Sequence, residues 1–506
     1  MKTFINKIKN FLYPYKEIIA SILIFFLPFF IYLRPNNLKQ LNFVDIKIIL
    51  FGHISLFFCI LILSFFTNKF IRQFVNTKFS VILFLFCVFF YLQFFYIFFE
   101  ESFELNYLYI LIVFEIISLS FVIIIYNFKK SFIKFTIIYS TILITYYTLS
   151  IVSFHLDLNN YEFKSKKSLN AVNIPESHIH DKRNVYYLIF DGMMSLKLAS
   201  ELNIVDEKKE LINLNNLKLR YINKSFSNYN KSHITLASIF KLDYPQNQKD
   251  LPPKELNNFF PFKLYTATET NLLRYLKKVN VNFFWGGNNA APCREINLDI
   301  NCLENDLINN TFNMLLKFYF NTPINKFYYN NFKKLDNPIY PSETLINKIQ
   351  LNDKQKNNFY FIHNLSPHNP YIFNSDCSIK KNKDEDYFNG YKDNYICALQ
   401  KIQNIMEKLN HYDPNAIILI QGDHGWEQIG VDLDDKQLIN YRAKIFNAIK
   451  APDECFNKFG FPNTTINTIR FVMNCAYGFE FKKMPNFHYF AIDDRSVLNE
   501  THSLEW

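Results

Sequence analysis

The sequence predicts an α/β protein in two parts. An N-terminal bundle of about five transmembrane helices precedes an extracytoplasmic α/β domain with a mostly parallel central sheet. The first observation behind this prediction is the charge distribution: residues 1–160 hold 13 Lys/Arg and 7 Asp/Glu, whereas residues 161–506 hold 42 and 38. The second is a set of short apolar runs in the later part, each ending in polar residues. The mean hydropathy of −0.04 therefore averages two unlike parts.

Composition excludes several classes of protein. Of 506 residues, 49% are hydrophobic, with 57 Phe but only 10 Gly and 8 Cys. Disordered chains lack this hydrophobicity, collagens need far more Gly, and disulfide miniproteins need denser Cys. The length allows more than one domain. The net charge of +10 forms no dense basic stripe, so no nucleic-acid partner is predicted.

Five apolar runs divide the first part. Most approach the roughly 20 residues that cross a hydrocarbon core of about 30 Å. A buried core helix is the alternative for any single run, but five in succession favour membrane spans. The first run is short and contains Pro28; a cleavable signal peptide is its alternative, but no small-residue cleavage site follows. The runs are Ile18–Leu33, Ile48–Phe66, Phe79–Phe99, Leu105–Tyr126 and Phe135–Phe154.

Lys and Arg in the loops predict the orientation. The N-terminal segment and the second and fourth loops are basic, while the third loop carries Glu100, Glu101 and Glu104. The positive-inside rule then puts the N-terminus in the cytoplasm and everything after Phe154 outside it. The predicted parts are a five-span bundle over 1–157, a linker over 158–182 along the membrane surface, and an outer domain over 183–506.

Glu115 lies in the middle of the fourth run. A carboxylate inside a membrane is costly and is by default a candidate functional group. A protonated or paired group inside the bundle is the reading we favour.

Cysteine usage agrees with an oxidising compartment. Two of the eight cysteines lie in the spans and six in the outer part, an even number that predicts disulfides. Chain order predicts the pairs 293–302, 377–397 and 455–475, although other pairings remain open.

Three apolar runs in the outer part predict strands buried on both faces. They are Val185–Phe190, Phe359–Ile362 and Ala416–Ile420, and helical periods such as Leu345–Asn352 and Tyr395–Leu409 lie between them. Parallel strands bind ligands at their carboxyl ends. The residues after these runs are metal-ligand types, although Asp-Gly is also a common turn. They are Asp191, His363, Asp423 and His424.

The predicted nucleophile lies in the stretch Phe226–Phe240. A polar turn rich in hydroxyl groups runs into the apolar-periodic stretch Ile234–Phe240, which places Thr235 at or near a helix N-terminus. Backbone N–H groups and the helix dipole favour an anion there. A hydroxyl at that place can bind a metal and attack phosphorus, whereas the plain alternative is an N-cap.

In order along the chain, the motifs are YLIFDGM, HITLAS, LSPHNPY and IQGDHGWE. This ordered set resembles the alkaline phosphatase superfamily, and more narrowly its membrane-anchored sulfatase-like branch. That branch includes lipoteichoic acid synthases, phosphoglycerol transferases and lipid A phosphoethanolamine transferases. The resemblance implies an alkaline-phosphatase-like catalytic domain over 183–506, in the inner (plasma) membrane of a bacterium and facing the periplasm or cell exterior.

The resemblance also implies roles for individual residues. Thr235 matches the nucleophile, His368 matches the histidine that holds the substrate's phosphate or sulfate, and His363 is a weaker candidate for that neighbourhood. Asn467 and Arg470 resemble a recurring segment that we interpret as structural. The implied metal ligands are Asp191, Thr235, Asp423 and His424.

The expected cofactor is a divalent metal ion, Zn or Mn from the Asp/His/Thr ligand set. The metal would lower the pKa of the hydroxyl and stabilise phosphoryl charge, while His368 would balance that charge or protonate the leaving group. The expected reaction transfers a phosphoglycerol- or phosphoethanolamine-like head group from a phospholipid donor to a surface glycan acceptor, such as lipopolysaccharide, through a phospho-threonine. The alternative is a sulfatase-like hydrolase with water as acceptor.

Two departures from the family pattern narrow this expectation. No C-x-P-x-R motif is present, so the formylglycine chemistry of true sulfatases is not expected. The first acid is Asp191 rather than a Glu in a Gly-Glu-Ser motif, and the 50 residues after Gly425 contain no His. These features count against phosphoethanolamine as the donor group and against a second metal.

Overall fold

The structure is a computed structural model, and it falls into two compact units. Unit 1 comprises 1–172 and 306–335, and unit 2 comprises 173–305 and 336–506. The residues it describes are 15–34, 43–71, 78–96, 107–169, 183–244, 270–287, 293, 300–303, 315, 318–319, 322–323, 345, 357–380, 386–427, 435–490 and 499–501.

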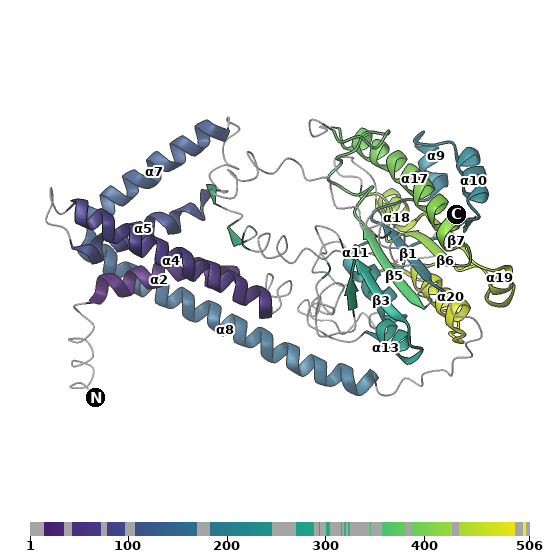
Figure 1. Cartoon of the computed structure of the whole chain (residues 1–506), viewed down its shortest axis with the longest axis horizontal. Coiled ribbons are helices and arrows are strands. Elements are labelled where there is room, and N and C mark those ends of the chain that lie inside the picture. The colour runs from purple at the N-terminus through teal and green to yellow at the C-terminus, as the bar shows by residue number, and fades with distance from the viewer. Residues whose placement is uncertain are drawn as a thin grey trace. The chain divides into compact units, whose positions relative to one another are not determined.

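Unit 1 is helical, and each predicted apolar run lies largely in one of its helices (Figure 1). Three helical stretches are long and apolar enough to cross a membrane: Asp45–Ile71, Ile110–Asn127 and Lys129–Ser153. The stretch Phe79–Gln93 is apolar but shorter. The helices are α2 (Lys16–Tyr32), α4 (Phe43–Ile71), α5 (Phe79–Gln93), α7 (Tyr107–Asn127) and α8 (Lys129–Leu169).

The end of the bundle differs from the predicted boundary at residue 157. Helix α8 continues to Leu169 and so includes the first part of the stretch expected to be a linker. No Gly or Pro between 154 and 169 ends the helix, and its Glu and Lys residues have good helix propensity. The rest of the expected linker, 170–182, lies outside the described residues.

Two polar side chains inside unit 1 have partners on neighbouring helices. Gln93 of α5 donates from Nε2 to Glu115 of α7 at 3.4 Å, as the paired interpretation of this carboxyl predicts. In the turn of α2 before Pro28, the carbonyl of Phe25 accepts from Nε2 of the buried His53 at 2.8 Å. This bond joins α4 to α2 inside unit 1.

The segment 306–335 returns to unit 1 from the middle of the outer part of the chain. Its described residues include Phe318, which is 3% exposed, and Tyr319. The Tyr319 hydroxyl lies 3.2 Å from Nδ1 of His53. The rings of Phe318 and Tyr319 both pack against Phe94 of the bundle. Because Nε2 of His53 donates to a carbonyl, Nδ1 of the neutral ring accepts from Tyr319.

Unit 2 is built on a seven-stranded mixed sheet in the order β2-β7-β6-β1-β5-β3-β4. The pairings from β6 through β4 are parallel, while β7 is antiparallel to both β6 and β2. The predicted parallel centre is therefore present, with an antiparallel edge. The strands are β1 (Val185–Phe190), β2 (Arg220–Tyr221), β3 (Asn282–Gly286), β4 (Ile300–Cys302), β5 (Asn358–Asn364), β6 (Ile417–Gly422) and β7 (Asn447–Lys450).

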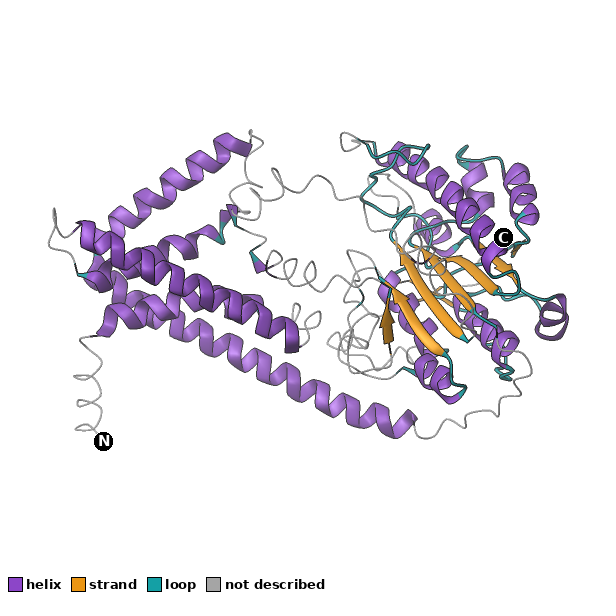
Figure 2. Ribbon diagram, in the orientation of Figure 1, coloured by secondary structure: helices purple, strands orange, loops and turns teal. Residues whose placement is uncertain are grey.

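Helices cover both faces of this sheet (Figure 2), and β1 is buried along its whole length. Successive residues of a strand point to opposite faces. Val185, Tyr187 and Ile189 pack with α11 (Ser232–Lys241), α13 (Asn271–Lys278) and α20 (Thr465–Tyr477). Tyr186, Leu188 and Phe190 pack with α9 (Leu196–Glu201) and α17 (Tyr387–Tyr412). The remaining elements are α10 (Glu207–Asn216), α18 (Asp435–Ala443), α19 (Asp453–Phe459), β8 (His488–Phe490) and β9 (Asn499–Thr501).

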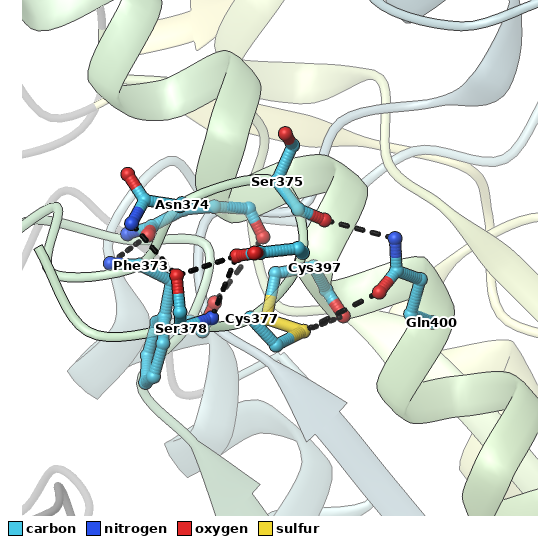
Figure 3. The surroundings of a disulfide bond; sticks show 10 residues. Phe373, Asn374, Ser375, Cys377, Ser378, Cys397 and Gln400 are labelled. Carbon is cyan, nitrogen blue, oxygen red and sulfur yellow. Dashed lines mark hydrogen bonds between the residues drawn. A yellow bond between two sulfur atoms is a disulfide. The ribbon is translucent and has the colours of Figure 1, made fainter.

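The three predicted disulfide pairs are confirmed: 293–302, 377–397 and 455–475. The second joins the segment after β5 to α17 (Figure 3). Around it, Gln400 of α17 donates to the carbonyl of Ser375, and Asn374 donates to Ser378, both at 2.8 Å. These bonds fix the segment that begins with the LSPHNPY motif.

Candidate functional site

The predicted acids and histidines meet at the carboxyl ends of three adjacent strands. β1 and β6 are parallel neighbours with Phe190 opposite Gly422. Asp191 and Asp423, the residues directly after these strands, therefore lie side by side. His363 lies within β5 opposite Ile189, rather than after the strand as the sequence predicted. The shared edge follows from parallel pairing, which places all three carboxyl ends together.

Asp191 is at the centre of the cluster and is 4% exposed. Its Oδ1 accepts from the Ser232 hydroxyl at 3.3 Å and lies 3.4 Å from Nε2 of His424. Its Oδ2 lies 3.5 Å from Nε2 of His363 on the other side. One carboxylate thus faces a hydroxyl and two imidazoles.

Asp423 is fully buried, and its two oxygens have different surroundings. Oδ1 accepts the backbone N–H groups of Gly192 at 3.0 Å and His424 at 2.9 Å. Oδ2 has no hydrogen-bond partner among the described residues. A buried carboxylate oxygen without a donor is costly, and a cation is one way to satisfy it.

His424 has the geometry of a metal-binding histidine. Its Nδ1 donates to the carbonyl of Gly425 at 2.6 Å, because a carbonyl only accepts. In the neutral ring this leaves a lone pair on Nε2, which lies 3.1 Å from the Ser232 hydroxyl. Burial lowers the pKa of His424 and so favours that neutral ring. Metal-binding histidines commonly donate their other N–H to such a carbonyl.

The electrostatics of the two acids also suit a cation. Burial raises the pKa of Asp191 well above its ordinary value, and the charge of Asp423 raises it further. Burial opposes ionisation of Asp423 too, but His424, His363 and the N–H of Gly192 hold its pKa below the ordinary value. Two buried carboxylates this close ionise together only beside positive charge.

The ligand atoms form two overlapping sets, each within 4.8 Å. One is Asp191, His368 and His424; the other is Asp191, His363 and Asp423. Carboxylate and imidazole ligands of this kind suit a divalent transition-metal ion or zinc. The residues present therefore fit the predicted divalent metal, and three of its predicted ligands, Asp191, Asp423 and His424, lie together.

Thr235 does not join this cluster. Helix α11 begins at Ser232, so Thr235 lies one turn inside it and is completely buried. Its Oγ1 donates to the carbonyl of Tyr229 at 3.0 Å and lies 3.1 Å from the Ser227 hydroxyl. The hydroxyl that reaches Asp191 belongs to Ser232, at the first position of the helix.

Thr235 is therefore near the helix N-terminus, as predicted, but it is the fourth residue of the helix rather than the first, for a local reason. The prediction took the first apolar residue of the periodic stretch as the start of the helix. The helix extends two residues further toward the N-terminus, through the polar Ser232 and His233. Ser232 is consequently the first residue of the helix, at the end where the helix dipole is positive.

The loop before Ser232 is held from several sides. Asn228 donates from Nδ2 to the Phe487 carbonyl at 2.8 Å, and its Oδ1 accepts from the Thr465 hydroxyl at 2.8 Å. His488 of β8 hydrogen-bonds from Nδ1 to the Ser227 carbonyl. The start of α11 is thereby fixed relative to the sheet.

Asn467 and Arg470 have structural roles, as predicted. Asn467 of α20 brackets the backbone of Met484, with Nδ2 donating to its carbonyl at 3.0 Å and Oδ1 accepting its N–H at 2.7 Å. Arg470 donates to the carbonyls of Leu242 and Lys482, each at 2.7 Å. These contacts hold the segment that leads to His488.

His368 lies at the edge of the site. Its backbone N–H donates to the Asp191 carbonyl at 3.0 Å, and its Nε2 lies 3.1 Å from Oε2 of Glu427. Burial lowers the pKa of His368, but the charges of Asp191 and Glu427 outweigh this and raise it to about 10. The two carboxylates thus favour the protonated ring of His368, whereas burial favours the neutral ring of His424.

Glu427 and Arg442 are site residues that the sequence did not single out. Arg442 of α18 donates from Nη1 to Oε1 of Glu427 at 2.8 Å. Burial raises the pKa of Glu427, but its bond to His368 and the charge of Arg442 hold it well below the ordinary value. Glu427 lies inside the IQGDHGWE motif, whereas no pattern in the sequence marks Arg442.

No family model and no curated protein matches the chain. The solved structures that resemble it include phosphoethanolamine transferases, a lipoteichoic acid synthase and a protein of the alkaline phosphatase superfamily.

Three of these similarities are as follows. The C-terminal periplasmic domain of EptC from Escherichia coli, in complex with Zn, has 13% identity and a TM-score of 0.41, covering 65% of this chain and 96% of that one. The integral membrane phosphoethanolamine transferase A of Neisseria meningitidis has 12% identity and a TM-score of 0.40, covering 91% of this chain and 95% of that one. The lipoteichoic acid synthase LtaP of Listeria monocytogenes has 15% identity and a TM-score of 0.34, covering 62% of this chain and 77% of that one. At such identities, and with TM-scores below 0.5, these similarities do not assign a function.

Proposed function

We propose that the protein is a metal-dependent, membrane-bound phosphoester transferase that forms a covalent intermediate on Ser232. One observation carries this proposal. The Ser232 hydroxyl, at the first position of α11, lies 3.3 Å from Asp191 and 3.1 Å from Nε2 of His424. A nucleophile is recognised by such contact with groups that can accept its proton or hold a metal beside it.

Asp191, Asp423 and His424 would hold the metal, with Ser232 beside them. A divalent ion bound there would lower the pKa of the hydroxyl and neutralise charge on the phosphoryl oxygens. Ser232 is the first residue of α11, and the dipole of a helix favours an anionic group at that end. The cationic His368 adds positive charge at the site edge.

The reaction has two displacements. The Ser232 oxygen attacks phosphorus, a phosphoserine ester forms, and the bond from phosphorus to the lipid's glycerol oxygen breaks, with a proton passing to that oxygen. An acceptor hydroxyl then attacks the phosphoserine, loses its proton and releases Ser232. This replaces the phospho-threonine expected from the sequence, because the Thr235 hydroxyl is buried against the Tyr229 carbonyl.

The donor class follows from the membrane helices. An enzyme with helices long and apolar enough to cross a membrane shares that membrane with phospholipids, whose head groups are phosphodiesters. A phosphoglycerol- or phosphoethanolamine-like unit is the group transferred, and a surface glycan is the acceptor in this proposal. The proposed location is the plasma membrane of a bacterium, with unit 2 outside the cytoplasm.

A labelling experiment tests the proposal. The purified protein is incubated with phosphatidylglycerol or phosphatidylethanolamine labelled in the head group, and labelled peptides are identified by mass spectrometry. We expect label on Ser232 that Ser232→Ala removes. Label on Thr235 would contradict the assignment of the nucleophile. No label with either lipid, together with hydrolysis of a soluble phosphodiester, would favour a hydrolase that uses water.

A further inference from the structure

Three charged side chains meet at the edge of the site. The Glu427 carboxylate accepts from Nη1 of Arg442 through Oε1 and faces Nε2 of His368 through Oε2, at 2.8 and 3.1 Å. Arg442 comes from α18 and His368 from the segment after β5, so the two cations belong to separate elements. A single carboxylate thus bridges an imidazole and a guanidinium beside the proposed nucleophile.

Both ring nitrogens of His368 are already used. Nδ1 lies 2.5 Å from the carbonyl of Asn369, which only accepts, and Nε2 faces the carboxylate of Glu427. No N–H of His368 is left for a substrate while Glu427 holds this position. The predicted role of His368 in binding a phosphate therefore requires Glu427 to leave.

We propose that His368 and Arg442 form an anion-binding pair for the substrate's phosphodiester, and that the Glu427 carboxylate occupies this position until the substrate displaces it. The inference rests on the proposed function. A carboxylate and a phosphodiester each spread one negative charge over two oxygens, so the two groups suit the same donors. One free phosphodiester oxygen would face Nε2 of His368, and the other would face Arg442.

The contacts indicate which partner moves. Arg442 is also bound to the carbonyl of Asn230 at 3.1 Å, and His368 is held by its backbone N–H on Asp191 and by Nδ1 on Asn369. Among the residues that the structure describes, the Glu427 side chain hydrogen-bonds or pairs with Arg442 and His368, and 21% of it is exposed. Glu427 is therefore the group that can turn to solvent.

The position is close enough to serve the reaction. A ligand atom of His368 lies within 4.8 Å of those of Asp191 and His424. Nε2 of His424 is in turn 3.1 Å from the Ser232 hydroxyl. A phosphodiester held by the cation pair would present its phosphorus near Ser232, and the displaced carboxylate would no longer repel it.

Binding of dimethyl phosphate, a phosphodiester with one charge and two free oxygens, tests the proposal. The full chain in detergent with Zn²⁺ is titrated by calorimetry. Glu427→Gln keeps the shape of the side chain but removes the competing charge, so we expect binding about tenfold tighter. Arg442→Gln should weaken binding by a similar factor. Glu407→Gln, on the exposed face of α17, is the matched control and should change nothing.

Unchanged or weaker binding by Glu427→Gln would overturn the proposal, because Glu427 would then support the site rather than block it. If this variant does not fold, Glu427→Asp replaces it, since the shorter side chain cannot bridge both cations, and it should also bind more tightly. Ser232→Ala should keep the binding and its response to Glu427→Gln. If Glu427→Gln binds dimethyl phosphate more tightly but no label appears on Ser232, only the proposed transferase activity is contradicted. If label appears on Ser232 but Glu427→Gln does not bind more tightly, only the proposed displacement of Glu427 is contradicted.

Discussion

Thr235→Val separates the two hydroxyls at the start of α11. Valine has nearly the shape of threonine but cannot donate to the Tyr229 carbonyl, 3.0 Å away. That carbonyl keeps a second donor, the Ser227 hydroxyl. The variant therefore loses one buried hydrogen bond without leaving its acceptor unpaired, a loss of about 1 kcal/mol in the free energy of unfolding.

We expect Thr235→Val to lower the melting temperature slightly and to change the labelling of the enzyme little. A loss of this size lowers the melting temperature of a large domain by about 3 °C. Transfer of label from phospholipid to the enzyme should stay within about threefold of the parent, because the Ser232 hydroxyl is untouched. Ser232→Ala should behave in the opposite way, with a melting temperature near that of the parent and no label.

The two measurements are made on the same preparations, thermal unfolding by intrinsic fluorescence and labelling by mass spectrometry. Thr235→Ser, which keeps the hydroxyl but loses a buried methyl group, is the control; it should lose about 1 kcal/mol of stability and keep its labelling. A Thr235→Val protein that melts within about 3 °C of the parent but takes up no label would refute the assignment of Ser232 as nucleophile.

Three further predictions follow from the site and its supports. Removing divalent metal with a chelator should lower the melting temperature, since Asp191 and Asp423 then face each other without a cation, and adding Zn²⁺ or Mn²⁺ should restore it. Gly425→Ala should abolish metal binding measured by calorimetry, because its Cβ would lie 1.9 Å from the Tyr441 carbonyl oxygen; unchanged affinity would refute this. Burial lowers the pKa of His488 to about 4, so the unfolded chain takes up a proton first as pH falls from 6.5. Stability should therefore fall by up to about 3 kcal/mol between pH 6.5 and 4, and denaturant titrations of a His488→Gln variant should show a smaller dependence.

The strands that carry the site were predictable because their burial is continuous. The run Val185–Phe190 is apolar without interruption and forms β1 over the same residues. The runs for β5 and β6 were predicted too short, since both strands continue into polar residues. Gln421 of β6 is buried because its side chain accepts from the Tyr187 hydroxyl at 2.6 Å. A hydrogen bond across the sheet has no signature in the local sequence.

The site was only partly predictable for the same reason. Asp191, Asp423 and His424 follow strands directly, so parallel pairing brings them together. Ser232 was missed because a helix start depends on the loop that fixes it, and this loop is held by α20 and β8 from far along the chain. Arg442 lies on a helix with no periodic pattern and reaches the site only through the fold.

The return of segment 306–335 to unit 1 bears on any attempt to produce the outer domain alone. A fragment begun at residue 183 would still contain Phe318 and Tyr319, whose rings pack on the bundle residue Phe94. Without the helices, these aromatic side chains would lose that cover and favour aggregation in water. Replacing 306–335 with a short Gly/Ser linker would remove these aromatic side chains. A soluble, secreted form of the domain thus calls for two deletions rather than one.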